Sequence, residues 1–92
     1  MTHTTALHVA VQNNDLKIIE LLVRDGASID TRQPDGKTPL LIAVENRNHG
    51  MIQLLLKLGA NKSLEDTEGS TAIDLAEGHS TIIALLEAPQ EI

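Results

Sequence analysis

The chain repeats itself with a period of 33 residues. The stretch DGKTPLLIAVENRN begins at Asp35, and EGSTAIDLAEGHS begins 33 residues later at Glu68. A third copy, TALHVAVQNND, begins at Thr5 and keeps the same step. A fixed period of this length indicates a stack of similar units, because a pair of short helices cannot bury its apolar side alone. We therefore expect a single domain over residues 1–92, with repeats of about 3–35, 36–68 and 69–88 and a tail of 89–92.

Each copy has the pattern of a helix, a turn, a second helix and an extended loop. In the middle copy Thr38 is placed to cap the first helix, and Pro39 suits its first position, where the backbone N–H has no helical partner. Residues 46–48 then interrupt the helix. A second, strongly apolar helix ends at Gly59, where glycine lets the backbone turn left-handed. The corresponding cap and stop residues of the first copy are Thr5, Asp15 and Gly26.

Two longer loops join the copies. Residues 27–36 and 60–69 each lead from a short extended run into a glycine turn, at Gly36 and Gly69. Such a run followed by a turn favours a hairpin. We expect each loop to form a two-stranded finger.

The last copy is shorter than the others. It has two fewer residues between Ala76 and Ile82 than the first copy has between Ala10 and Ile18. The missing pair falls at the end of the first helix, which we expect to be about half a turn short. An atypical last unit is common in repeat arrays. Because no further copy follows, we expect part of its apolar block, residues 82–86, to be exposed.

The composition favours helices and excludes several classes of site. There is no Phe, Trp or Tyr, so the core must consist of aliphatic side chains, which suits closely packed helices. There is no cysteine, which excludes disulfides and Cys-based zinc sites and suits a reducing compartment such as the cytoplasm. No apolar run approaches the roughly 20 residues that span a membrane, and no signal peptide is recognisable.

The negative charge is concentrated in the last third of the chain. Residues 1–64 carry six acids and seven bases, whereas residues 65–92 carry seven acids and no Lys or Arg. Nucleic acid would be repelled from that end, and no basic stripe elsewhere offers it a binding surface. The acidic part is either a solubilising end of the array or a surface that steers a basic partner toward it.

No pattern of catalytic or metal-binding residues accompanies the repeats. None of the four histidines has the spacing around a Glu that marks a zinc helix. Asp74, His79 and Ser80 are the residue types of a catalytic triad, but no nucleophile elbow or oxyanion loop accompanies them. Residues 66–69 lack the alternating acids of a calcium loop. We expect His8 to have a structural role, His79 to stand at a helix start, and the chain to have no catalytic site, metal or cofactor.

The motifs resemble those of the ankyrin repeat family. The middle copy has Gly-x-Thr-Pro-Leu-x-x-Ala at residues 36–43 and Leu-Leu-Leu-x-x-Gly-Ala-Asn at 54–61, and the other copies keep much of this pattern. The resemblance covers about residues 3–88. It implies a mostly α-helical solenoid of helix-turn-helix units with β-hairpin-like finger loops. It also implies a module that binds other proteins through its finger tips and the exposed side of each first helix.

The resemblance also supplies the candidate contact residues, carried over by position. On the fingers they are Arg32, Gln33, Asp35 and Lys37, then Asp66, Glu68 and Ser70. On the first helices they are Gln12 and Asn13, then Glu45 and Asn46, then Glu77.

Two departures from the family pattern bear on the structure. The motif histidine that ties neighbouring repeats together by hydrogen bonds survives only as His8, and Leu41 and Asp74 replace it in the later copies. The usual Gly-His between the helices is Arg47-Asn48 in the middle copy. A left-handed Arg costs roughly 1 kcal/mol more than a Gly. Either this turn differs locally, or another contact offsets the strain.

We therefore expect a non-catalytic protein-binding module that scaffolds, targets or blocks another protein, with no nucleic-acid or membrane partner. An alternative is a small acidic inhibitor of the immunity-protein or antitoxin type, which would mask a basic surface on a toxin or enzyme. The uncovered end repeats also allow the chain to associate with itself.

Overall fold

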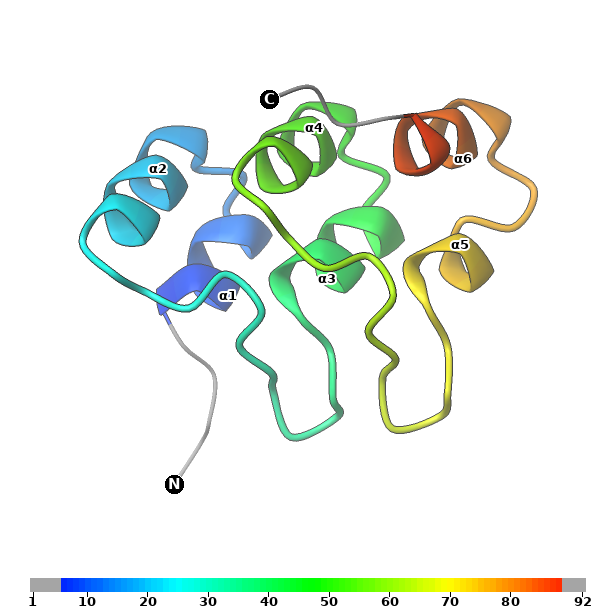
Figure 1. Ribbon diagram of the computed structural model, residues 1–92, viewed down its shortest axis with the longest axis horizontal. Coiled ribbons are helices and arrows are strands. Elements are labelled where there is room, and N and C mark those ends of the chain that lie inside the picture. Colours follow the sequence, from blue (N-terminus) through cyan, green and yellow to red (C-terminus); the bar gives the residue numbers. More distant parts are fainter. Residues whose placement is uncertain (1–5, 89–92) are drawn as a thin grey trace.

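Three pairs of helices stand side by side in a computed structural model that describes residues 6–88 (Figure 1). The first helices, α1, α3 and α5, form one layer, and α2, α4 and α6 form the other. Both long loops extend away from the first layer on the same side. In that layer α1 packs beside α3 and α3 beside α5, and each first helix packs on the second helix of its own pair. The helices are α1 (Ala6–Gln12), α2 (Leu16–Arg24), α3 (Pro39–Glu45), α4 (His49–Lys57), α5 (Ala72–Leu75) and α6 (Ser80–Glu87).

The helix caps confirm the local pattern. The Thr38 side chain accepts a hydrogen bond from the Leu41 N–H at 3.3 Å, with Pro39 at the first helical position. Asp15 caps α2 in the same way, accepting from the Ile18 N–H at 3.2 Å. The predicted helix ends have left-handed backbones, with φ angles of 99° at Gly26 and 100° at Gly59. The cap expected at Thr5 lies outside the described residues.

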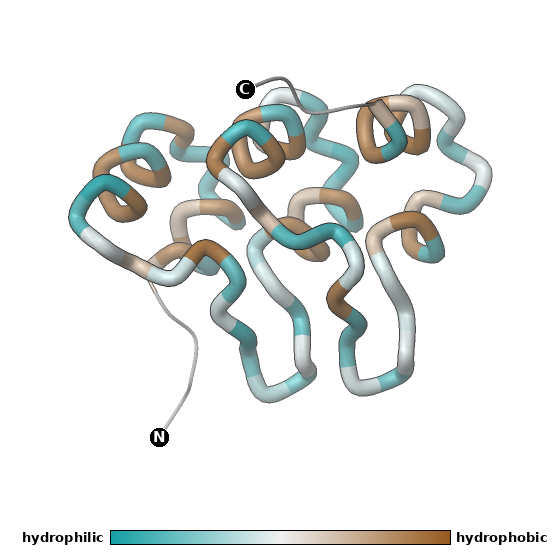
Figure 2. The backbone as a smooth tube through the Cα atoms, viewed as in Figure 1, coloured by the Kyte–Doolittle hydropathy of each residue, from teal (hydrophilic) through white to brown (hydrophobic). Residues whose placement is uncertain are grey.

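The core lies between the two helix layers and is aliphatic throughout. Figure 2 shows hydrophobic residues on the sides of the helices that face one another, while the loop tips are mostly polar or neutral. The middle pair contributes the largest share, because it has a neighbour on both sides. Its fully buried side chains include Leu40, Ala43, Met51, Ile52 and Leu55.

The third pair is shorter, as predicted. Helix α5 has four residues, whereas α1 and α3 have seven. The chain leaves the helix at Ala76, whose N–H lies within hydrogen-bond distance of both the Ala72 and the Ile73 carbonyls. Gly78, with a φ of 86°, then redirects the backbone to His79, which stands at the start of α6 as expected.

The turn inside each pair uses a left-handed residue. Asn14 has a φ of 56°, Arg47 a φ of 55° and Gly78 a φ of 86°, so the turn at Arg47 does not depart from the others. The strain at Arg47 is therefore present. The following residue, Asn48, caps α4 by accepting from the Met51 N–H at 3.2 Å. Its amide also donates to Asn14 Oδ1 at 2.5 Å, which joins the turns of the first two pairs.

Exposed apolar side chains gather on the first pair, and the expectation that they would lie in the last apolar block was wrong. The large exposed ones in the described residues are Val9, Leu16, Ile18 and Leu21. In the last pair Ile82 and Leu86 are buried against the preceding helices, and Ile83 and Leu85 are half-buried. The outermost positions of α6 carry Ala84 and Glu87 instead of larger apolar residues.

Candidate functional site

The two finger loops are tight hairpin-like turns. In the first finger the Gln33 N–H donates to the Lys37 carbonyl at 3.0 Å, and the Gly36 N–H donates to the Gln33 carbonyl at 2.8 Å. The second finger repeats both bonds at Asp66 and Gly69, each at 3.0 Å. No strand forms within residues 6–88, so the two-stranded fingers expected from sequence are reduced to these turns.

Carboxylates brace both turns from within. Asp35 accepts from the Lys37 N–H at 3.0 Å. In the second finger Asp66 accepts from the Glu68 and Ser70 N–H groups at 2.9 and 3.0 Å. Asp66 is only 8% exposed, so its expected role as a fingertip contact was wrong. An Asp whose side chain bonds to the backbone two residues on is a common device of turns, and its place three residues before Gly69 is the sequence signal for it.

The two fingers are bonded to each other. Both the N–H and the hydroxyl of Thr67 donate to the Asp35 carbonyl, each at 3.0 Å. The fingers approach so closely at Gly36 that a Cβ there would lie 2.6 Å from the Thr67 nitrogen. Sequence reasoning missed Thr67. The signal was available, because Pro34 has no N–H at the equivalent place and Thr67 restores one.

The base of the first finger is fixed to α1. His8 is fully buried, and its Nε2 donates to the Lys37 carbonyl at 2.9 Å. This confirms the structural role predicted for His8. The tie connects the first pair of helices to the finger that leads into the second.

An ion pair joins the first finger to α3. The Lys37 ammonium lies 3.0 Å from Glu45 Oε2. The hydrogen bond to Glu45 is the main cause that raises the pKa of Lys37; the nearby Glu45, Asp35 and Asp66 charges add to it and partial burial opposes it. Two candidate contact residues from different elements are thus held together.

The candidate residues fall into three groups by exposure. Those that project into solvent are Gln12, Asn13, Arg32, Asp35, Glu45, Asn46, Glu68 and Glu77. Gln33, Lys37 and Ser70 are half-buried, and Asp66 is buried. We call the strip formed by the finger residues 32–37 and 67–70 and the exposed ends of α1, α3 and α5 the inner face.

The inner face changes charge along the stack. Around the first finger both signs occur, with Arg32 and Asp35 exposed and Lys37 paired with Glu45. Beyond it the exposed groups Glu68 and Glu77 are acidic, and residues 65–88 contain no Lys or Arg. Asp74 is also exposed, but it forms a capping box with Thr71, accepting the Thr71 N–H at 3.0 Å. The Asp74 carboxylate is therefore committed to the start of α5.

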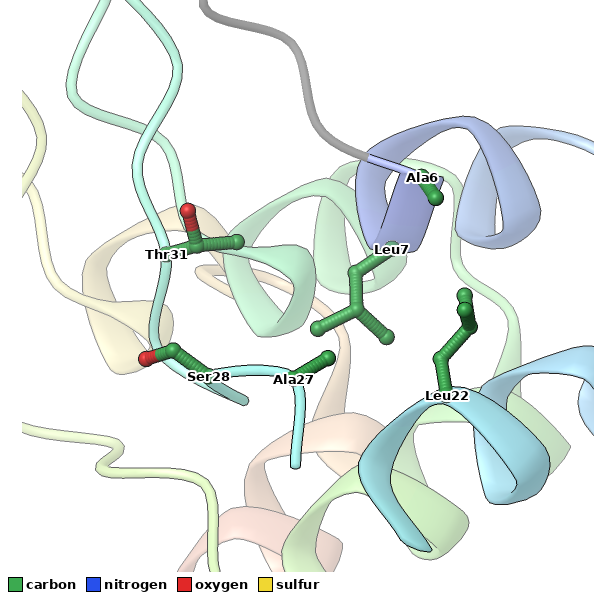
Figure 3. A pocket seen from close by; sticks show the side chains of 6 residues that line it. All are labelled: Ala6, Leu7, Leu22, Ala27, Ser28 and Thr31. Atoms are coloured by element: carbon green, nitrogen blue, oxygen red, sulfur yellow. The ribbon is translucent and has the colours of Figure 1, made fainter. Parts of the chain in front are cut away.

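The hollows on the described surface are small. One, of about 120 Å³, lies where α1, α2 and the following loop meet in the first pair (Figure 3). Its lining is mostly apolar and has no titratable side chain: Ala6, Leu7, Leu22, Ala27, Ser28 and Thr31. Among residues 6–88 no three His, Asp or Glu side chains gather in a way that could hold a metal ion. In the same range no helix has the length and apolarity needed to cross a membrane.

Comparison with known families agrees with this arrangement. The family model for ankyrin repeats matches residues 7–92 as three copies. The chain belongs to the ankyrin repeat family. Ankyrin repeats generally mediate protein–protein interaction, and the family is generally non-catalytic. The chain matches no curated protein closely enough to count as a relative.

Proposed function

We propose that this ankyrin protein is a non-catalytic binding module that holds a partner protein on its inner face. The observation that carries the proposal is the bonding of the two fingers into one unit. Thr67 joins the fingers at Asp35, and the pair of Lys37 with Glu45 joins them to α3. A surface held in one geometry loses little conformational entropy when a partner docks, which favours binding.

The charge gradient supports a partner with a basic surface at the third repeat. Glu68 and Glu77 are exposed there, and no Lys or Arg in residues 65–88 offsets them. Opposite potentials raise the rate of encounter and fix the orientation of a complex more than they raise its final affinity. We expect the acidic third repeat to orient the partner, and the mixed charges around the first finger to set the register. No cofactor, nucleic acid or membrane enters this proposal, and the lack of cysteine suits the cytoplasm or another reducing compartment.

The acidic third repeat also favours a second candidate, an inhibitor of the immunity-protein or antitoxin type. Such a protein would mask a basic surface on a toxin or enzyme. The two candidates differ in the fate of the partner. A scaffold or recruitment module leaves its partner active, whereas an inhibitor silences it at stoichiometric concentration.

The test is affinity capture from the native lysate with identification by mass spectrometry, using two charge-matched variants. The first, Glu68→Lys with Glu77→Lys, reverses the acidic inner face. The second, Glu20→Lys with Glu87→Lys, makes the same charge change at exposed positions on α2 and α6. A specific partner retained by the second variant and lost from the first is the expected result. Loss from both variants, or from the second alone, would refute the inner face as the site.

An assay of the captured partner then separates the two candidates. Its activity is measured with and without an excess of the ankyrin protein. Unchanged activity supports the scaffold, and loss of activity supports the inhibitor.

A further inference from the structure

The first repeat exposes apolar side chains on the side that faces away from the second. Val9 on α1 is 46% exposed, and Ile18 and Leu21 on α2 are 42% and 48% exposed. We call the surface formed by these three residues the leading face. Isolated exposed aliphatic residues are ordinary, but here three share one surface.

The later repeats show what normally covers these positions. Ile42 lies 33 residues after Val9 and is 5% exposed. The equivalents of Ile18 are Met51 and Ile82, which are 0% and 1% exposed. In those repeats the preceding repeat covers the position. The leading face therefore has the composition of a repeat-to-repeat contact but lacks the contact.

The leading face also contains a shallow groove of about 410 Å³ between α1 and α2. Val9 and Ile18 line it, together with Ala6, Ala10, Asn13 and Asp15. The small alanine side chains leave room for large aliphatic side chains of another molecule. An apolar ridge such as that formed by Ile18 and Leu21 matches this groove in chemistry.

The opposite end of the array does not fit the leading face. Where the second repeat has Leu56, 5% exposed, the third has the exposed Glu87. Helix α5 is also three residues shorter than α3, so the first-helix layer is incomplete at that end. A head-to-tail contact would bury Glu87 against apolar residues, which is costly without a paired cation. Such a contact would also repeat without closing.

The charges beside the leading face suit a symmetric contact instead. Lys17, Ile18, Leu21 and Asp25 fall within about 100° of one another around the α2 axis. Lys17 lies near the start of α2 and Asp25 just beyond its end, and both are exposed. Two such helices packed antiparallel bring Lys17 of each copy toward Asp25 of the other, with Ile18 and Leu21 between these charges. The two helix dipoles then also oppose each other.

We propose that the leading face binds the leading face of a second copy of this chain across a two-fold axis, with the two α2 helices antiparallel. The patch is small compared with a permanent interface, so the dimer is weak and reversible. A two-fold contact closes, and association stops at the dimer. The contact is distinct from the inner face, since none of Val9, Ile18 and Leu21 belongs to it.

The test is sedimentation equilibrium with interference optics, because the chain has no aromatic residue to absorb in the near ultraviolet. The wild-type chain should show a monomer–dimer equilibrium with no larger species. Ile18→Glu should raise the dissociation constant by about tenfold or more. The matched control is Leu16→Glu, because Leu16 is 39% exposed on the same helix but points about 160° away from Ile18. This control should leave the dissociation constant unchanged.

A charge exchange tests the antiparallel arrangement without altering any apolar contact. Lys17→Glu and Asp25→Lys should each weaken the dimer, and the double variant should restore it. Circular dichroism confirms that each variant is folded, and the charge exchange decides the matter if Ile18→Glu is not. A wild-type chain that stays monomeric at about 1 mM overturns the proposal. Species larger than a dimer, equal weakening by Leu16→Glu, or failure of the double variant to restore the dimer would each overturn it too.

Discussion

The contact between the fingers predicts that two glycines with the same backbone angle respond differently to the same substitution. Gly36 has a φ of 82° and Gly69 a φ of 81°. Replacing either with Ala places a Cβ in the left-handed region, at a cost of about 1 kcal/mol. A Cβ at Gly69 meets nothing within 4 Å, whereas one at Gly36 lies 2.6 Å from the Thr67 nitrogen and 3.0 Å from the Asp66 carbonyl carbon.

Gly36→Ala must therefore also move one finger away from the other. That movement lengthens the two hydrogen bonds from Thr67 to the Asp35 carbonyl, each of which contributes about 0.5–1.5 kcal/mol. We expect Gly36→Ala to lower the free energy of unfolding by about 2–3 kcal/mol and Gly69→Ala by about 1 kcal/mol. Urea denaturation followed by circular dichroism measures both values, and the difference removes the shared backbone cost. Equal losses for the two variants would refute the account of the joined fingers.

Three further predictions concern single residues. Arg47→Gly should raise the free energy of unfolding by about 1 kcal/mol, because it relieves a left-handed Arg, and a loss in urea denaturation would contradict this. Lys62→Met should cost about 0.5–1 kcal/mol, because the Lys62 ammonium donates to the Leu86 carbonyl near the end of α6; faster hydrogen exchange at that end of α6 is the readout, and unchanged exchange counts against it. Glu45→Gln should lower the pKa of Lys37 toward its ordinary value of 10.5, as followed by NMR titration. Because the folded-state pKa is raised, the stability from this pair is fully present below pH 10.5 and is lost as the pH rises through the raised value; a Lys37 pKa that Glu45→Gln leaves unchanged would contradict the role of the pair.

The helices could be predicted because local chemistry decides where they begin and end. Thr38 with Pro39, Asp15, and the glycines at 26 and 59 each act on backbone groups within four residues, so their effect is visible in the sequence. The 33-residue step then placed similar units next to each other. Neither inference required knowledge of distant contacts.

The fingers and the end faces depend on contacts between repeats, and here the sequence was a weaker guide. Asp66 has the residue type of an exposed contact, but its carboxylate points into its own turn. The bond from Thr67 to Asp35 crosses 32 residues of chain. Exposure at Ile18 depends on what lies beside its repeat, because the equivalent Met51 is fully buried.

The most direct test of the inner face is amide hydrogen exchange of the chain, measured alone and in complex with the partner identified by affinity capture. Binding as proposed should slow exchange in residues 32–37 and 67–70 and near Glu45 and Glu77. Exchange in the exposed parts of α2, α4 and α6 should be unchanged. Protection confined to those second helices, with exchange in both fingers unaltered, would contradict the proposal that the inner face binds the partner.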